Sequence, residues 1–335
     1  KEKMLPTAFG EFRLRAYREE DRKALMDLWQ LVFGKAMDPK VWAWKYEVCP
    51  YPMLSLVCLN AEGMPVVFYA GIAYPCRHFG RNAEMVHLVD NMTHPDYRQM
   101  IAGRKGLFLE TARHFFIDNE SLGDCRYFYG FPGERNHRLA KLFLNGIDFQ
   151  SGPAYLVCDI QEQPALLSRG FFTKELKSPS PAKLDELWNR VSGHYTVSVI
   201  RDHRFVQWRY FSHPVNTYRF YVSADYRGRY NAWVVVRQEK EATILVDMLF
   251  APGGWGMPGL LARIRKDAAV AGIRKLVTWL PESHFAAKLL LANGFTQFPE
   301  PLGIRPAGRV PAQDVLHRPW VEGEVYYTMG DADIF

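Results

Sequence analysis

The sequence contains little cysteine and no long apolar segment. Its five cysteines are scattered and none forms a Cys-x-x-Cys pair, so we expect neither a disulfide framework nor a metal site. No apolar run reaches the roughly 18 residues that a membrane-spanning helix needs, and residues 1–6 resemble neither a signal peptide nor a transit sequence. These absences predict a cytoplasmic protein with free thiols at Cys49, Cys58, Cys76, Cys125 and Cys158.

The basic charge of the chain is small and dispersed. The formal net charge is +6, but lysine and arginine form no block or stripe and accompany no known nucleic-acid-binding module. We therefore expect no nucleic-acid partner, whereas an anionic ligand is compatible with this charge. The length of 335 residues and the hydrophobic content of 48% are enough for two globular domains with packed cores.

Segments of the first half of the sequence recur in the second half in the same order. Trp44, Lys45 and Tyr46 reappear as Trp208, Arg209 and Tyr210, displaced by 164 residues. Further ordered matches join Val89-Asp90 and Pro95 to Val246-Asp247 and Pro252, and Asn145-Gly146 to Asn293-Gly294. Such matches with drifting offsets are typical of duplicated domains that have lost loop residues. We predict one domain over residues 1–160, a connector over 161–182 and a second domain over 183–335.

A strand, a loop and a helix are predicted between Glu84 and Ala112. Residues 85–92 form a short, mostly apolar run, which the Pro95-Asp96 pair ends before a glycine-containing loop. A helix is expected over about residues 106–116. Small residues ahead of a helix N-terminus favour anion binding, and neither a P-loop nor a dinucleotide fingerprint fits the spacing. The loop holds Gly103 and Gly106, and the nearby cations are Arg98, Arg104 and Lys105.

The stretch resembles motif A of the GCN5-related N-acetyltransferases. In that family a strand runs into an Arg/Gln-x-x-Gly-x-Gly/Ala loop whose backbone amides hold the pyrophosphate of acetyl-CoA. His94-Pro-Asp-Tyr-Arg98 matches the lead-in, residues 99–106 match the loop loosely, and residues 127–149 are similar to the second signature of the family. The resemblance implies an α/β fold with two tandem domains, each a mixed, mostly antiparallel twisted sheet flanked by helices.

The resemblance also implies that the first domain binds acetyl-CoA or another acyl-CoA as co-substrate. Backbone amides of residues 91–93 are then expected to contact the thioester oxygen. Asn136 is expected to touch the coenzyme, to cap the following helix, or both. The implied coenzyme-binding residues are Asn91, Met92, Thr93, Arg98, Ala102, Gly103, Arg104, Lys105, Gly106 and Asn136.

Three residues are candidates for acid and base chemistry. His87 occupies the position, counted back from Arg98, at which family members often carry a glutamate base, and imidazole suits proton transfer near neutral pH. The alternative is a hydrogen-bonded histidine inside a packed sheet. Asp90 offers a carboxylate, but its recurrence as Asp247 favours a scaffold role. Leu142 stands where the family has its tyrosine acid, so Tyr129 or Tyr127 is the candidate substitute.

The second copy is expected not to bind CoA through its own loop. Residues 252–260 form a shorter loop without lysine or arginine, and Pro258 lies near the helix start. The aromatic segment 208–221 and residues 325–335 could instead line an acceptor pocket, although recurring tryptophans are more typical of a core. Asp331 and Asp333 are expected to be solvated.

The sequence thus predicts an N-acyltransferase that moves an acetyl or other acyl group from acyl-CoA to an amine of a small molecule. Two alternatives remain. One is an N-acyltransferase that uses long-chain acyl-CoA or an acyl carrier protein as donor. The other is a non-catalytic CoA-binding or assembly protein with the same fold.

Overall fold

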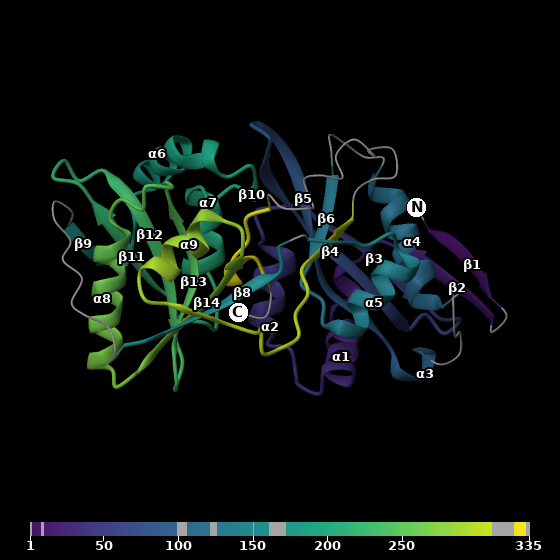
Figure 1. Ribbon diagram of the computed structural model, residues 1–335. Coiled ribbons are helices and arrows are strands. Elements are labelled where there is room, and N and C mark those ends of the chain that lie inside the picture. The colour runs from purple at the N-terminus through teal and green to yellow at the C-terminus, as the bar shows by residue number, and fades with distance from the viewer. Residues whose placement is uncertain are drawn as a thin grey trace. The chain divides into compact units, whose positions relative to one another are not determined.

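The structure, a computed structural model, describes residues 2–7, 10–98, 106–120, 126–149, 151–160, 172–309 and 325–332. The chain forms two compact units (Figure 1). Where described, the first unit holds residues 1–75, 83–147 and 307–316, and the second holds residues 76–82, 148–306 and 317–335. No helix in these described ranges is long and apolar enough to span a membrane.

The first unit is built on a mixed sheet with the strand order β1-β2-β3-β4-β5-β6-β16-β7. Neighbours from β1 to β4 are antiparallel, whereas β5 and β6 run parallel. The last residues of β4 pair with β10 and count with the second unit. The strands are β1 (Lys3–Thr7), β2 (Gly10–Arg15), β3 (Met53–Leu59), β4 (Pro65–His78), β5 (Arg81–Thr93), β6 (Arg126–Gly130), β7 (Ile147–Asp148), β10 (Val197–Val199) and β16 (Ala307–Arg309).

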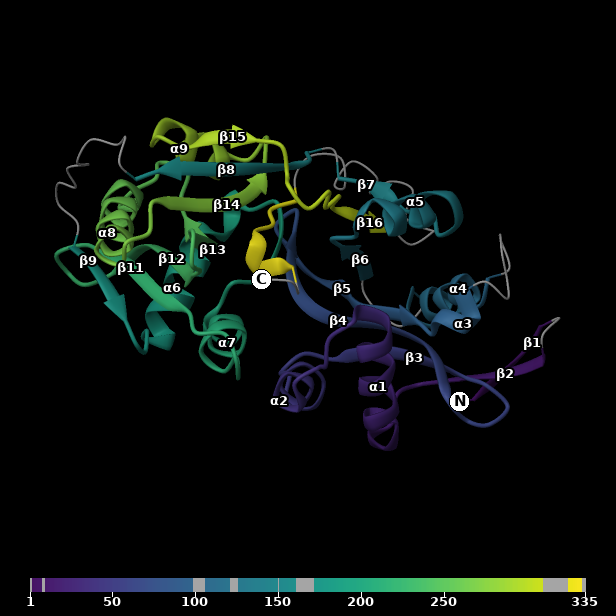
Figure 2. The same ribbon diagram turned by 90° about the horizontal axis from the view of Figure 1, so that it is seen from below.

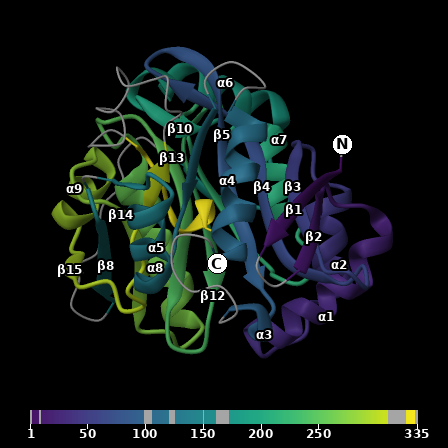
Figure 3. The same cartoon turned by 90° about the vertical axis from the view of Figure 1, so that its right-hand side faces the viewer.

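Helices cover this sheet through apolar faces. Phe116 of α4 packs edge-on to Phe128 of β6 with ring centroids 4.9 Å apart, inside one hydrophobic core that spans β2 to β6. Figure 3 shows α4 in front of β4 and β5. Trp42 and Tyr46 pack against Phe68 of β4. The helices are α1 (Arg22–Phe33), α2 (Pro39–Trp42), a π-helical turn η2 (Ala43–Glu47), α3 (Pro95–Arg98), α4 (Leu107–Glu120) and α5 (Glu134–Phe143), with a 3-10 turn η1 (Glu19–Asp21).

The second unit has a sheet of the same kind, in the order β15-β8-β14-β13-β12-β11-β9. Only β13 and β14 are parallel, and β8 runs antiparallel beside β14 (Figure 2). The strands are β8 (Pro153–Asp159), β9 (Phe172–Leu176), β11 (Arg219–Ala224), β12 (Tyr230–Gln238), β13 (Thr243–Phe250), β14 (Lys275–Pro281) and β15 (Thr296–Phe298). The helical elements are α6 (Pro181–Val191), η3 (Ser192–His194), α7 (His203–Val206), η4 (Gln207–Phe211), α8 (Met257–Val270), α9 (Phe285–Ala292) and η6 (Met329–Asp331).

The recurring Trp-Lys/Arg-Tyr motif forms the same local structure in both units. In each unit a short helix leads directly into a π-helical turn, η2 or η4, that carries the motif. An aspartate caps each short helix, with Asp38 accepting from the Lys40 amide and Asp202 from the Phe205 amide. Trp44 and Trp208 are 7% and 5% exposed, so the prediction that these aromatic residues belong to the core is confirmed.

The predicted α/β fold class with two mixed sheets is confirmed. The strand and the helix predicted between Glu84 and Ala112 are confirmed as β5 and α4. The division of the chain differs from the expected 1–160, 161–182 and 183–335. Residues 153–159 pair with β14 in the second sheet, while 307–309 pair with β6 in the first. Within the expected connector, residues 172–176 are strand β9, which pairs with β11. Strand partners so distant in sequence leave no local signal.

Candidate functional site

The parallel strands β5 and β6 stop pairing halfway along β5, and we call this point the first fork. Their backbone pairing runs from Glu84 with Arg126 to His87 with Tyr129 and goes no further. Leu88 to Thr93 continue β5 beyond the fork, and α4 begins at Leu107. A strand edge that loses its partner exposes backbone donors and acceptors, which a ligand can use.

His87 and Tyr129 lie together at the first fork. Their rings stack with centroids 5.0 Å apart and an interplanar angle of 18°, and Phe131 packs edge-on to the histidine at 5.9 Å. His87 is 3% exposed and Tyr129 is 2% exposed. The structure therefore brings two of the three predicted catalytic side chains into contact, although both are buried. Tyr127, the other candidate acid, is fully buried in the same strand.

Asp90 lies on β5 just beyond the first fork, in an ion pair that the sequence analysis did not predict. Its carboxylate accepts from Lys45 Nζ at 2.6 Å and from the Tyr46 hydroxyl. The side chains of Asp90 and Lys45 are 3% and 8% exposed. The backbone φ of Asp90 is +51°, a left-handed conformation that costs a non-glycine residue free energy unless its surroundings hold it. The recurrence of Lys/Arg-Tyr with Asp was the available signal for this contact.

The residues predicted to contact the coenzyme come next along the chain, from the end of β5 to the start of α4. The Asn91 side-chain oxygen accepts from the Ala70 amide at 2.9 Å. Arg98 Nε donates to the Thr93 carbonyl at 3.1 Å, and Met92 is buried. Gly106 precedes α4, and its carbonyl accepts the first helical bond from Glu110. Ala102, Gly103, Arg104 and Lys105 lie outside the described residues.

Asn136 is exposed at the third residue of α5. The residue at the helix cap is Gly133, with no side-chain cap bond, so the predicted capping role of Asn136 is wrong. Glycine is tolerated there because the chain enters the helix in an extended conformation. Leu142, at the position of the family's tyrosine acid, is 65% exposed on the same helix.

The second unit has an equivalent fork between β13 and β14. Their parallel pairing covers only Thr243 with Leu276 and Ile244 with Val277. Immediately beyond it, Thr278 Oγ1 donates to the Leu245 carbonyl at 2.8 Å. The Tyr195 hydroxyl accepts from the Phe250 amide at 3.1 Å and donates to the Phe250 carbonyl at 2.7 Å. Side chains of the unit itself thus bind the strand edge that leads away from this second fork.

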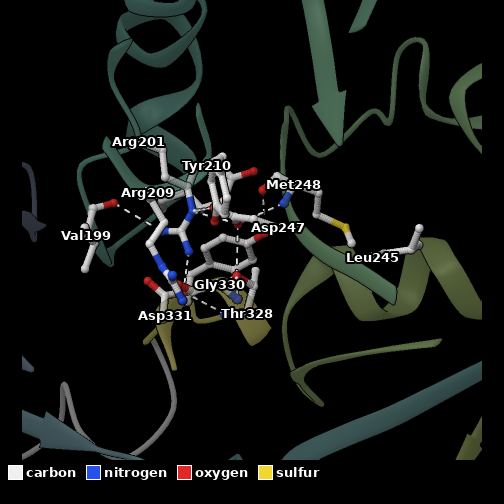
Figure 4. Close-up of polar contacts among 12 residues, drawn as sticks. Val199, Arg201, Arg209, Tyr210, Leu245, Asp247, Met248, Thr328, Gly330 and Asp331 are labelled. Carbon is white, nitrogen blue, oxygen red and sulfur yellow. Dashed lines mark hydrogen bonds and ion pairs between the residues drawn. The ribbon is translucent and has the colours of Figure 1, made fainter. Parts of the chain in front are cut away.

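Asp247, the counterpart of Asp90, is fully buried at the centre of a polar cluster (Figure 4). Arg201 Nε donates to both its oxygens, at 3.0 and 3.2 Å, and the Tyr210 hydroxyl donates at 2.7 Å. Burial by itself lowers the pKa of Arg201, but Asp247 and Asp331 together raise it well above its ordinary value. Burial, followed by the charge of Asp247, raises the pKa of Tyr210. Arg201 is therefore charged and Tyr210 neutral.

The expectation that Asp331 is solvated is wrong. Its side chain is 2% exposed and forms an ion pair with Arg201. It also accepts from the Thr328 amide at 2.8 Å. Because Arg201 comes from a segment 130 residues away, the sequence around Asp331 carries no sign of this burial. Asp333 lies outside the described residues.

The loop before α8 is filled by its own neighbours. Gly254 and Gly256 have φ values of +64° and +87°, which favour glycine. A Cβ atom on Gly253 would collide with the Trp255 indole, and one on Gly254 with the Leu289 side chain. In the described part of the chain, no three His, Cys, Asp or Glu side chains lie close enough to hold a metal ion.

Comparison with known proteins gives a fold. No protein-family model and no curated protein matches the sequence. A probable N-acyltransferase from Enterococcus faecalis V583 matches 90% of this chain and 73% of its own, with a TM-score of 0.70 and 11% identity. A tandem GNAT protein from the clavulanic acid biosynthesis pathway matches over 90% and 99%, with a TM-score of 0.59 and 10% identity. Saccharomyces cerevisiae N-myristoyltransferase with bound myristoyl-CoA matches over 91% and 80%, with a TM-score of 0.57 and 10% identity.

The chain therefore has the two-domain fold of the GCN5-related N-acetyltransferases, and the fold that the sequence resemblance implied is confirmed. Each fork lies at the end of a parallel strand pair, just before the recurring aspartate, Asp90 or Asp247.

Proposed function

We propose that the first unit binds an acyl-CoA at the first fork and transfers the acyl group to an amine. The observation that carries this proposal is the end of β5–β6 pairing at His87 and Tyr129, followed along the chain by the N-terminus of α4. An unpaired strand edge suits the amide groups of pantetheine, and a helix N-terminus suits a pyrophosphate. At 10–11% identity the solved structures support the fold rather than the substrate.

In the proposed reaction the amine nitrogen attacks the thioester carbonyl carbon. A base first takes a proton from the ammonium, so that the neutral amine can attack. A C–N bond forms, the C–S bond breaks, the CoA thiolate leaves, and the nitrogen loses a further proton as the amide forms. Backbone amides of Asn91, Met92 and Thr93 are proposed to stabilise the negative charge on the carbonyl oxygen. We propose His87 as the proton acceptor and Tyr129, stacked on it, as the group that returns a proton to the thiolate.

Asp90 is proposed to act on the backbone rather than on a proton. Its carboxylate is neutralised by Lys45 and also bonded to Tyr46, which opposes a role as a free base. The same contacts hold the left-handed conformation of Asp90 directly before Asn91. Asp90 is therefore a positioning residue for the proposed oxyanion contacts.

A non-catalytic CoA-binding protein is the second candidate. The exposed Leu142 offers no hydroxyl that could act as an acid. His87 and Tyr129 are almost fully buried, so a substrate would reach neither of them unless the fork opened. This alternative predicts coenzyme binding without acyl transfer.

Binding and turnover separate these candidates. Isothermal titration with acetyl-CoA, a long-chain acyl-CoA and an acylated carrier protein identifies the donor, and thiol release with a panel of small amines reports transfer. Gly106→Asp should abolish binding, because aspartate suits a helix start but repels a phosphate. Trp255→Asp, in the loop of the second unit where the side chain is 66% exposed, is the matched control and should bind normally.

The outcomes are distinct. Thiol release that His87→Gln lowers at unchanged affinity supports the enzyme, and binding without release supports the second candidate. No binding of any donor, or equal loss in both aspartate variants, refutes the assignment of the first fork.

A further inference from the structure

We propose that residues 325–332, which we call the strap, permanently occupy the second fork in the place where a coenzyme would lie. The strap belongs to the second unit by its contacts. Its turn η6 contacts both β13 and β14, the two strands whose separation forms the fork. The inference rests on the contacts of the strap itself, and only the comparison with a coenzyme uses the function proposed for the first unit.

The strap binds the edge of β13 through hydrogen bonds. The Tyr326 hydroxyl donates to the Met248 carbonyl at 2.7 Å, next to the contacts that Tyr195 makes with Phe250. The rings of Tyr195 and Tyr326 pack edge-on at 4.8 Å. The Met248 amide donates to Asp247 Oδ1 at 2.8 Å. The Met248 and Phe250 backbone groups beyond the fork are thus bound within the unit, with none of these four left for a pantetheine.

Buried ions fix the strap in place. Thr328 Oγ1 donates to Asp247 at 3.0 Å, and Asp331 forms an ion pair with Arg201. Arg209 donates to the Gly330 and Ala332 carbonyls at 3.0 and 2.7 Å. The charges of Arg201 and Arg209 are therefore balanced by those of Asp247 and Asp331. The net charge of these four residues is zero only when Asp331 of the strap is present. Without the strap, a cation would remain buried without its counter-ion, which is costly.

The fit leaves no room for a larger residue at the closest point. A Cβ atom on Gly330 would collide with the Tyr210 hydroxyl and would lie 3.1 Å from Asp247 Cβ. The Gly330 amide donates to Thr328 Oγ1 at 3.1 Å, and the Thr328 amide to Asp331. Amides bonded in this way exchange with solvent only when the strap opens.

Hydrogen exchange read by mass spectrometry on the full chain tests the proposal. Asp331→Asn and Thr328→Val keep side-chain shape but remove the charge or the hydroxyl. Both should accelerate exchange in residues 326–332 and 248–250 at least about tenfold, and Asp331→Asn should lower the melting temperature by about 6 °C or more. Asp96→Asn, whose side chain is 77% exposed in the first unit, is the control and should change neither quantity.

A second measurement uses the unaltered protein. Millimolar coenzyme A should leave the exchange of residues 326–332 unchanged, because a permanent occupant does not compete with ligand. Faster strap exchange on addition of coenzyme A would show a displaceable lid and overturn the proposal, as would variants that exchange like the control. If Asp331→Asn prevents folding, Tyr326→Phe provides the same exchange comparison with the loss of a single hydroxyl. If the first fork binds no coenzyme, the exchange rates of the strap variants still test the proposal, because they do not depend on coenzyme binding.

Discussion

Replacing Lys45 by methionine should destabilise the first unit by about 3–5 kcal/mol, because it leaves the Asp90 carboxylate buried without its cation. The pair is desolvated on both sides, with Asp90 3% and Lys45 8% exposed, and Nζ lies 2.6 Å from the carboxylate. Methionine retains most of the aliphatic volume of lysine, so lost packing contributes little. The Tyr46 hydroxyl, which also donates to Asp90, brings no charge that could replace the lysine.

The assay must report on one unit, because a chain with two units need not unfold in a single step. Native-state hydrogen exchange of β5 amides at increasing urea gives the opening free energy locally. The control is Lys3→Met, since Lys3 pairs with Asp118 in the same unit but the side chains are 39% and 37% exposed. Exposed pairs contribute about 0–1 kcal/mol, so this variant should differ little from the parent.

A second substitution distinguishes charge from shape. Lys45→Met with Asp90→Asn removes both charges, so the double variant should recover a large part of the loss. A Lys45→Met protein that is no less stable than Lys3→Met would refute the reasoning. So would a double variant that gains nothing over the single one, because the cost would then lie in packing.

Three further perturbations have defined outcomes. Burial, followed by the charge of Arg201, lowers the pKa of His284 to about 3 from an ordinary value of 6.5. The free energy of unfolding should therefore fall as pH drops from 6.5 towards 3, by up to about 1.4 kcal/mol per pH unit. His284→Asn should flatten this dependence in acid titrations, and an unchanged slope would exclude His284 as its source. Gly71→Ala places a Cβ 2.5 Å from Val86 Cγ1 beside the first fork, so calorimetry should show a loss of about 1–3 kcal/mol; full stability would mean that β4 and β5 separate freely. Burial raises the pKa of the Cys58 thiol to about 12, so iodoacetamide should label it only in unfolded protein; rapid native labelling would contradict that burial.

The fold was predictable because its local signals are strong. The apolar run 85–92 and the Pro95-Asp96 break predicted β5 and its end, and the ordered recurrences predicted two domains of similar fold. The placement of β8 in the second sheet was not predictable, since the alternating burial of residues 153–159 suits a strand of either sheet. The environment of Asp331 depends on Arg201, and an aspartate two residues from another, Asp333, reads locally as solvated.

Only part of the candidate site was predictable from the sequence. His87 and Tyr129 belong to separate elements, and their stacking follows from the parallel register of β5 with β6, which no local pattern specifies. The partner of Asp90 was within reach of the sequence, because Lys45-Tyr46 and Asp90 recur together as Arg209-Tyr210 and Asp247. Shared recurrence indicates contact as readily as it indicates scaffold.

One position differs between the two units beside the recurring Trp-Lys/Arg-Tyr motif. The residue 164 positions before Arg201 is Met37, which is 9% exposed and directly precedes the Asp38 cap, as Arg201 precedes the Asp202 cap. In the first unit, Lys45 from the π-helical turn forms an ion pair with Asp90. In the second unit, Arg201 forms the ion pair with Asp247, and Arg209 donates to the carbonyls of Gly330 and Ala332 in the strap.

We therefore expect Arg201 and the strap to depend on each other for their place in the second unit. Arg201 without Asp331 would leave an excess positive charge in a dry cluster, and Asp331 without Arg201 would leave an excess negative one. Arg201→Met should consequently release the strap as effectively as Asp331→Asn, whereas Arg201→Met with Asp331→Asn should be less unstable than either single variant. Exchange of residues 326–332 in the double variant measures this dependence, and strictly additive effects would show that the two residues act separately.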